Sequence, residues 1–320
     1  MRYKKWLVLP CCAALALGVA ACGGDDGGSG SGGGDSGGGQ NLSGNIRIDG
    51  SSTVFPFAQA AAETFQQQNP NVKITVGESG TGGGFEKFCN SETDISNASR
   101  AIEDDERSAC SEKQVSFDEI QVANDGIAVV SNPSLKIDCM TTDQLKTLWA
   151  TDAAKTYREV DPKLPAAEVS LFGPGTDSGT FDFFTEEING EEGKTRKDYQ
   201  PSEDDNVLVQ GVAGDQNGLG YFGFSYYEQN QDKLNLIGVD DGSGCVKPSS
   251  ADIQSGKYKP LSRPIYMYPS SAALKRPEVR AFMDFIVANY KEISEVAQIV
   301  PMTDRQAADS KAKVAKLAAT

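Results

Sequence analysis

The stretch from Gly173 to Phe184 combines a glycine-rich turn and several hydroxyl side chains with the start of an apolar helical pattern. Phe181, Phe184 and Ile188 recur at helical spacing, which predicts a helix that begins near Thr180. The first N–H groups of such a helix lack backbone acceptors and together carry about half a positive charge. With the hydroxyls of the turn they could bind a small oxyanion. A simple N-cap is the alternative interpretation.

Two more hydroxyl-rich turns follow predicted strands earlier in the chain. Gly50-Ser51-Ser52-Thr53 follows an alternating apolar pattern over 45–49, and the turn from Glu78 to Gly84 follows a second such pattern over 72–76. Each turn leads into a helical pattern, so the segment predicts the βαβ unit of a parallel sheet. Ligands of such sheets bind beyond the carboxyl ends of the strands. The turns are therefore candidates for one binding site.

The remaining patterns predict a chain that alternates strands and helices in two lobes. A short strand ends in Ser99-Arg100, and the second lobe is expected to run from Thr141 to Ile253. The polar end of the chain from Asp304 is expected to be either a surface helix or a frayed tail. The other expected segments are strands over 126–130, 169–172 and 263–268, a charged, solvated helix face over 103–107, helices over 143–149 and after Pro277, and an aromatic patch over 219–227.

The first 44 residues have the composition of a leader and a tether. Residues 1–21 begin with basic side chains and continue with an apolar run that is short for a membrane span, as in a secretory signal. Small residues before Cys22 are typical of a lipoprotein cleavage box, in which the cysteine becomes the lipidated first residue. Residues 22–44 are rich in glycine and predict a flexible tether. A plain signal peptide with an incidental cysteine is the alternative.

Four cysteines lie in the part of the chain that would fold after export: Cys89, Cys110, Cys139 and Cys245. An even number in an exported protein predicts disulfides. Of three possible pairings, Cys89–Cys110 with Cys139–Cys245 is favoured, because each pair then stays within one predicted lobe. A zinc site is the alternative, but no two of these cysteines have C-x-x-C spacing and the chain contains no histidine.

The formal net charge of −15 argues against nucleic acid or anionic lipid as a partner. It does not exclude a small anion, because a site made of helix N-termini and one arginine acts through its local donors. No metal or cofactor is expected. The lipid anchor is the only membrane contact expected.

An enzyme would require Ser79 or Ser178 as nucleophile, and without histidine no Ser-His-Asp triad can form. The segment from Gly190 to Thr195 imitates a nucleotide-binding P-loop, but its glycines are too close together and the residues between them are acidic, so a solvent loop is expected. An adhesin or structural surface lipoprotein is the other alternative. It leaves the turns at the strand ends unexplained.

Five motifs occur in the order in which they stand in the PstS-type phosphate-binding proteins of bacterial ABC transporters, which this chain resembles from about residue 45 to residue 300. This resemblance implies an α/β chain with the type II periplasmic-binding-protein fold, in which two α/β lobes are joined by two hinge crossovers. The lobes implied are 45–128 with 265–320, and 129–264. The motifs are Asp49–Val54, Glu78–Gly84, Asn124–Val130, Gly175–Phe181 and Gly218–Phe224.

The resemblance also implies that the protein captures inorganic phosphate between its lobes and passes it to the permease subunits of an ABC transporter. It would act outside the cytoplasm as a monomer, anchored to the membrane by a lipid on Cys22. The residues that match the family's phosphate ligands motif by motif are Ser52, Thr53, Thr81, Ser178, Gly179 and Thr180. Ser99 and Arg100, at the end of the short third strand, are added as candidates from their position.

Two positions depart from better-known members of the family. Those proteins place an acidic residue after the short third strand, where it accepts the phosphate proton, and this chain has Arg100 there. They also place an arginine where this chain has Pro174. We expect Arg100 to supply the missing guanidinium, with a surface ion pair as the alternative. Asp177 is a candidate substitute acceptor, or it only caps its helix.

Overall fold

The computed structural model describes residues 42–176, 178–202 and 204–319. The predicted signal, Cys22, nearly all of the tether and Asp177 lie outside these residues. The strands are β1 (Gly44–Gly50), β2 (Val72–Val76), β3 (Ile95–Ala98), β4 (Ile120–Ser131), β5 (Cys139–Thr141), β6 (Ser170–Pro174), β7 (Gln200–Ser202), β8 (Gly218–Gly223), β9 (Asn235–Asp240), β10 (Cys245–Val246) and β11 (Ser262–Pro269). The helices are α1 (Phe55–Gln68), α2 (Gly80–Cys89), α3 (Asp104–Glu112), α4 (Thr142–Trp149), α5 (Tyr157–Val160), α6 (Gly179–Phe184), α7 (Asp205–Gly214), α8 (Phe224–Glu228), α9 (Ser250–Gln254), α10 (Ser271–Leu274), α11 (Pro277–Ala288), α12 (Tyr290–Val296) and α13 (Asp304–Leu317), with a π-helical turn at Thr185–Asn189.

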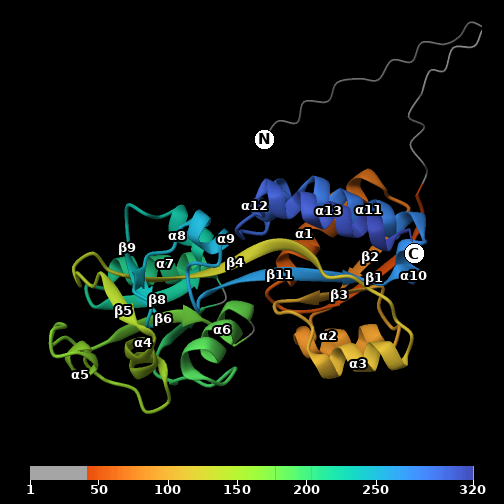
Figure 1. The fold of residues 1–320 in the computed structure, drawn as a ribbon. Helices are drawn as coiled ribbons and strands as arrows, with labels where there is room; N and C mark the ends of the chain where they lie inside the picture. The colour runs from red at the N-terminus through yellow and green to blue at the C-terminus, as the bar shows by residue number, and fades with distance from the viewer. Residues whose placement is uncertain (1–41, 177, 203, 320) are drawn as a thin grey trace, which may run out of the picture. The chain divides into compact units, whose positions relative to one another are not determined.

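The first lobe is built on the predicted βαβ unit. Strand β1 pairs in parallel with β2 and with β3, and β11 pairs antiparallel with β3. Figure 1 shows α1, α11 and α13 over one face of these strands, with α2 and α3 on the other. One buried cluster, with Phe57, Phe65 and Phe282 among its members, forms the core under α1 and α11. The apolar stripes read from the sequence therefore face inward as expected.

The second lobe has its own strands and its own core. Strand β8 pairs with β4 and β6, β6 pairs in parallel with β7, and β9 joins β4 to β5 and β10. Trp149, Phe184 and Tyr221 are fully buried, and the rings of Phe184 and Tyr221 stack 3.7 Å apart between centroids. The predicted helix over 143–149 and the aromatic patch over 219–227 both contribute to this core.

Two long strands, β4 and β11, cross from one lobe to the other (Figure 1). Strand β4 pairs with β11 from Ile120 to Gly126 and with β8 from Ile127 to Ser131. The sequence predicted only the apolar run over 126–130, because Asn124 and Asp125 interrupt the apolar pattern that buried strands usually show. The two hinge crossovers are those of the type II periplasmic-binding-protein fold. The residue limits of the lobes remain a prediction.

The chain ends in a helix that is only partly solvated. Helix α13 begins with a capping box in which Thr303 and Gln306 exchange side-chain and backbone hydrogen bonds. Its buried positions, Ala307, Ser310, Val314 and Leu317, share one face. The surface-helix alternative is therefore correct, with the addition that one stripe of α13 packs against the first lobe. Among the described residues, no helix combines the length and apolarity needed to cross a membrane.

Both predicted disulfides are present. Cys89 at the end of α2 is bonded to Cys110 in α3, 21 residues later. Cys139 in β5 is bonded to Cys245 in β10, 106 residues later. The second bond lies against β9, where a Cβ on Gly238 would come within 2.4 Å of the Cys245 sulfur. Crosslinks of this kind typically stabilise a fold by about 2–4 kcal/mol, mainly by restricting the unfolded chain.

Candidate functional site

Three turns at the carboxyl ends of strands supply the candidate site. The first, Ser51 to Thr53, joins β1 to α1, and the second precedes α2. The third joins β6 to α6, whose N-cap is Ser178. Gly50 makes the first turn possible because it has a φ of +139° and a Cβ there would lie 2.1 Å from the Asn97 carbonyl oxygen. The strand-turn-helix connections are those that the sequence predicted.

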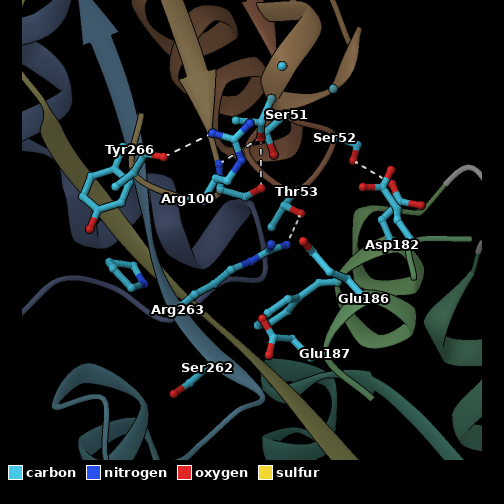
Figure 2. A pocket seen from close by; sticks show the side chains of 18 of the residues that line it. Ser51, Ser52, Thr53, Arg100, Asp182, Glu186, Glu187, Ser262, Arg263 and Tyr266 are labelled. Atoms are coloured by element: carbon cyan, nitrogen blue, oxygen red, sulfur yellow. Dashed lines mark hydrogen bonds between the residues drawn. The ribbon is translucent and has the colours of Figure 1, made fainter. Parts of the chain in front are cut away.

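A cleft of about 570 Å³ lies where the first two turns meet the second lobe. Hydroxyl groups and two arginines line it from the first lobe and from β11, and carboxylates line it from the second lobe (Figure 2). Five of the residues singled out from the sequence are on its wall, and these are Ser52, Thr53, Thr81, Ser99 and Arg100.

The other three residues lie beside this cleft. Ser178, Gly179 and Thr180 line an adjoining pocket of about 410 Å³, to which Ser52 and Thr53 also contribute. The Thr53 hydroxyl donates a hydrogen bond to the Gly179 carbonyl at 3.3 Å. A Cβ on Gly179 would lie only 2.4 Å from the Thr53 nitrogen. The turn of the second lobe is thus in close contact with the first turn, and Ser52 and Thr53 separate the two cavities.

The cap of α6 is made by Ser178, whose side chain accepts a hydrogen bond from the Thr180 N–H at 3.2 Å. From the sequence, Asp177 was a possible cap for this helix, but the N-cap residue of α6 is the adjacent Ser178. The apolar side chains of the predicted stripe, Phe181, Phe184 and Ile188, are buried as expected. Because the helix fixes that stripe inward, Asp182 in its first turn faces the cleft.

Hydrogen bonds within the first lobe hold the glycine-rich turn in place. The Ser79 hydroxyl and the Lys87 ammonium both bind the Asp49 carboxylate, at 2.6 Å each. Partial burial acts to raise the pKa of Asp49, but these two partners outweigh it and the pKa is lowered. The Thr81 hydroxyl lies 3.1 Å from the Ser99 hydroxyl, so two of the predicted ligands are next to each other.

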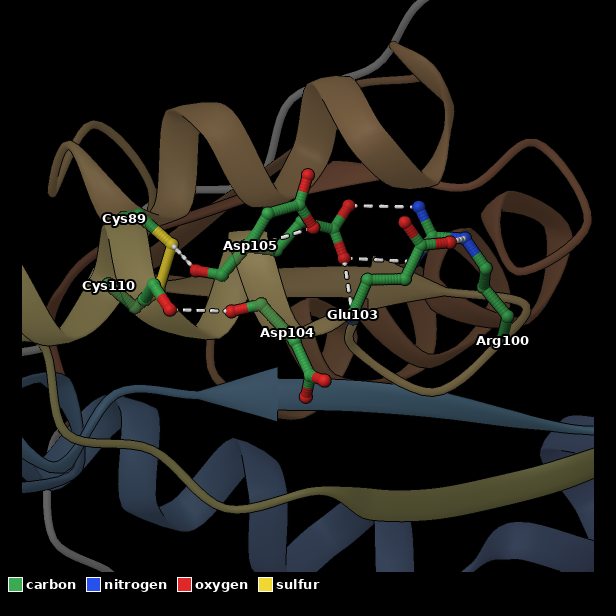
Figure 3. Close-up of a disulfide and its surroundings, with 8 residues drawn as sticks. Cys89, Arg100, Glu103, Asp104, Asp105 and Cys110 are labelled. Carbon is green, nitrogen blue, oxygen red and sulfur yellow. Dashed lines mark hydrogen bonds and ion pairs between the residues drawn. A yellow bond between two sulfur atoms is a disulfide. The ribbon is translucent and has the colours of Figure 1, made fainter.

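Arg100 is both an ion-pair residue and part of the cleft wall. Its guanidinium binds the Glu106 carboxylate in bidentate fashion, at 2.8 Å and 2.9 Å, and lies 3.2 Å from Glu103 (Figure 3). The bond to Glu106 is the main reason why the pKa of Arg100 is raised. The two interpretations of Arg100 made from the sequence are therefore compatible.

Arg263 is a site residue that the sequence analysis missed. It is the second residue of β11, lies opposite Asp125 on β4, and lines the same cleft. One of its Nη atoms donates to the Thr53 hydroxyl at 2.8 Å, and its Nε lies 3.4 Å from the Asp125 carboxylate. In the sequence analysis, Arg263 was only the first residue of the strand expected over 263–268. The available signal was a pair of opposite charges, with Asp125 in the motif Asn124–Val130 and Arg263 at the start of that expected strand.

Carboxylates of the second lobe form the opposite wall, and the sequence analysis did not assign them. Asp182, Glu186 and Glu187 all line the cleft, and the Ser52 hydroxyl reaches Asp182 at 3.5 Å (Figure 2). Burial, with a further contribution from Glu192, raises the pKa of Asp182 to about 6. Burial also raises the pKa of Glu187. An anion in this cleft therefore meets donors on one side and acceptors on the other.

The serines considered as nucleophiles are both hydrogen-bonded in the structure. The hydroxyl of Ser79 donates to Asp49, and that of Ser178 is the acceptor of a helix cap. The loop from Gly190 to Lys194 is exposed, as expected of a solvent loop. Within the described ranges, no cluster of three or more His, Cys, Asp or Glu residues is arranged to hold a metal ion.

Comparison with known proteins identifies the family. A model of the PBP superfamily domain matches residues 35–289. The protein SphX of Synechococcus elongatus is 45% identical over 261 residues, which are 80% of this chain and 77% of SphX. The phosphate-binding protein PstS of Staphylococcus saprophyticus is 38% identical over 315 residues, covering 97% of this chain and 94% of that protein. The chain belongs to the PstS-type family.

A solved structure supports the same assignment. The crystal structure of a possible phosphate-binding protein from Planctomyces limnophilus has 41% sequence identity to this chain and a TM-score of 0.82. The superposed region covers 87% of this chain and 99% of the Planctomyces limnophilus chain. The relatives at this level of identity are named as phosphate-binding proteins, and a more distant neighbour, from Vibrio cholerae, shares the fold. The type II periplasmic-binding-protein fold predicted from the motifs is therefore confirmed.

Proposed function

We propose that this protein binds inorganic phosphate in the cleft between its lobes and delivers it to the permease subunits of an ABC transporter. The observation that carries the proposal is the meeting of hydroxyl-rich turns and two arginines at the carboxyl ends of β1, β2 and β3. Hydroxyls, backbone N–H groups and guanidinium forks are the donors that phosphate oxygens prefer. The names of the PstS relatives support the same ligand.

Each predicted ligand has a role in this proposal. Ser52, Thr81 and Ser99 would donate to the anion from the first lobe, Thr53 would do so through its backbone N–H because its hydroxyl donates to Gly179, and Arg100 would add its charge. The remaining three, Ser178, Gly179 and Thr180, lie behind Ser52 and Thr53 and line the adjoining pocket. They would reach the same anion after a small movement of the second lobe against the first.

Asp182 is our candidate for the group that accepts the proton of the bound phosphate. It lies at the cleft beside Ser52, while Arg100 occupies the position of the family's usual acid. With a pKa of about 6, Asp182 is mostly ionised at neutral pH and can accept a hydrogen bond from a protonated oxyanion. A fully deprotonated anion such as sulfate would be repelled by it. This role replaces the one suggested for Asp177.

The cellular setting belongs to the proposal as well. Residues 1–21 would be removed on export, Cys22 would carry a lipid, and residues 22–44 would tether a monomer to the outer face of the membrane. The charge of −15 for the whole chain becomes −18 when Arg2, Lys4 and Lys5 leave with residues 1–21, which argues against nucleic acid as a ligand in this setting. Metabolic labelling with a radioactive fatty acid, in the wild type and in Cys22→Ala, would test the anchor. An unlabelled wild type would contradict it.

Titration calorimetry of the protein without its leader, with phosphate, sulfate and arsenate, tests the ligand. We expect phosphate to bind, and at 100 times its dissociation constant to stabilise the fold by about 2.7 kcal/mol in thermal unfolding. If another oxyanion binds and phosphate does not, the protein is still an anion-binding protein, but phosphate is not its ligand. Binding of none of the three would favour the adhesin or structural alternative.

A further inference from the structure

The two arginines of the cleft differ in how many of their donors are already used. A guanidinium carries five N–H groups. In Arg100, one Nη binds both Glu106 and the Ala101 carbonyl, the other Nη binds Glu106, and Nε lies 3.2 Å from Glu103. These contacts occupy four of the five groups. Arg100 therefore has one N–H group left for a ligand.

Arg263 has more donors to offer. Its Nε pairs with Asp125 and one Nη donates to the Thr53 hydroxyl, and the described residues provide no acceptor for the other three N–H groups. The guanidinium carbon lies 3.6 Å from the centre of the Phe183 ring, which fixes the plane of the group. Only 15% of the side chain is exposed, at the wall of the cleft. Charge, spare donors and a fixed plane suit bidentate binding of an oxyanion.

Arg263 also belongs to a chain of contacts that joins the lobes. Asp125 and Arg263 face each other on β4 and β11, the two strands that cross between the lobes. Arg263 donates to the Thr53 hydroxyl in the first lobe, and that hydroxyl donates to the Gly179 carbonyl in the second. Phe183, against which Arg263 packs, lies in α6 of the second lobe. One side chain thus contacts the hinge and both lobes.

We propose that Arg263 is the principal guanidinium that binds the anion, and that the chain Asp125–Arg263–Thr53–Gly179 couples anion binding to contact between the lobes. This inference rests on the proposed oxyanion binding. It adds that Arg263 is the main cationic ligand and that anion binding is linked to contact between the lobes. The simpler alternative is that Arg263 only neutralises buried Asp125. Neutralisation needs a positive charge but no fork, so a lysine would serve it, whereas bidentate binding would fail with lysine.

The test compares four variants by calorimetry with inorganic phosphate and by small-angle scattering with and without it. Arg263→Lys keeps the charge and removes the fork. The double variant Arg263→Gln with Asp125→Asn removes the fork without leaving a buried carboxylate unpaired, so that folding is preserved. Arg100→Gln tests the other arginine. Arg305→Gln, at an exposed position of α13, is the control with the same change in charge.

We expect phosphate affinity to fall at least about tenfold in Arg263→Lys and further in the double variant, because charged hydrogen bonds are lost. Arg100→Gln should lose less, and Arg305→Gln should bind as the wild type does. The compaction seen with saturating phosphate should weaken in both Arg263 variants. Wild-type affinity in Arg263→Lys would overturn the proposal, and so would full compaction in the double variant. If the wild type itself binds no phosphate, it is the proposed function that fails.

Discussion

At the scale of single residues, the cleft is divided by charge. Arg100 and Arg263 lie on one side, and Asp182, Glu186 and Glu187 lie on the other. In the part of the chain that the structure describes, none of these three carboxylates forms an ion pair. Burial disfavours the charged form of Asp182 and Glu187, and repulsion from Glu192 on Asp182 and from Glu186 on Glu187 adds to it, which is why both pKa values are raised.

The raised pKa of Asp182 predicts how stability depends on pH in the absence of ligand. The pKa of Asp182 is about 6 in the folded protein and 3.8 for an ordinary aspartate, so the folded protein keeps this proton to higher pH and Asp182 makes the fold less stable as pH rises from 4 to 6. Asp182→Asn removes the charge. We expect it to raise the free energy of unfolding at pH 8 by up to about 1 kcal/mol, since solvent screens this half-buried group.

Chemical denaturation of the wild type and Asp182→Asn at pH 4 and pH 8 measures the difference. It should vanish near pH 4, where the carboxyl is protonated in the folded protein. Asp309→Asn, an exposed position of α13, is the matched control and should show no comparable gain. An equal gain for Asp182→Asn at both pH values would show that its carboxylate charge is not the cause.

At the scale of elements, the contact between the first turn and the start of α6 determines how the donors of the two turns are placed. Gly179 has no room for a side chain, because its Cβ would lie 2.4 Å from the Thr53 nitrogen and 2.7 Å from the Ser52 hydroxyl oxygen. The atoms in the way include backbone, so the two turns would have to separate. The contact therefore depends on glycine for space rather than for an unusual backbone angle.

We predict that Gly179→Ala leaves each lobe folded but weakens phosphate binding by about tenfold or more, because donors of the two turns no longer converge. Calorimetry with phosphate measures the loss, and circular dichroism checks the fold. Gly214→Ala is the control, since a Cβ at that exposed end of α7 would meet nothing within 4 Å. Unchanged affinity in Gly179→Ala would mean that the contact is not needed for binding.

The sequence predicted the elements with strong apolar periodicity and the turns between them. The short strands β5, β7 and β10 were missed, because segments of two or three residues show no periodicity and depend on pairing with β9 or β6. Arg263 was missed for a related reason. Its importance comes from strand register, which places it opposite Asp125, 138 positions earlier in the chain. Local patterns contain no such information.

At the scale of the whole molecule, an acidic protein is expected to capture an anion. The net charge of −15 repels phosphate at long range, while the arginines attract it only within the cleft. The Debye length falls from about 30 Å at 0.01 M salt to about 8 Å at 0.15 M, so salt screens the repulsion first. We predict that the rate constant for phosphate association rises a few-fold over this range.

Rapid-mixing kinetics at several ionic strengths, with sodium chloride as the salt, measures this rate constant. When the net charges of protein and ligand are opposite, as for a polyanion and a basic protein, the association rate constant falls as salt is added. An association rate that falls as salt is added would mean that the local field of Arg100 and Arg263 extends beyond the cleft and outweighs the total charge.

The positions of the disulfides have a consequence for evolution as well as for stability. Cys89–Cys110 joins α2 to α3 in the first lobe and Cys139–Cys245 joins β5 to β10 in the second, so neither bond crosslinks a residue of β4 or β11. Each disulfide therefore restrains one half of the described structure and places no covalent restraint on the movement between the halves that we propose. In the proposed binding cycle, substitutions around these crosslinks would therefore change resistance to heat or proteases without adding a restraint on the binding and release of phosphate.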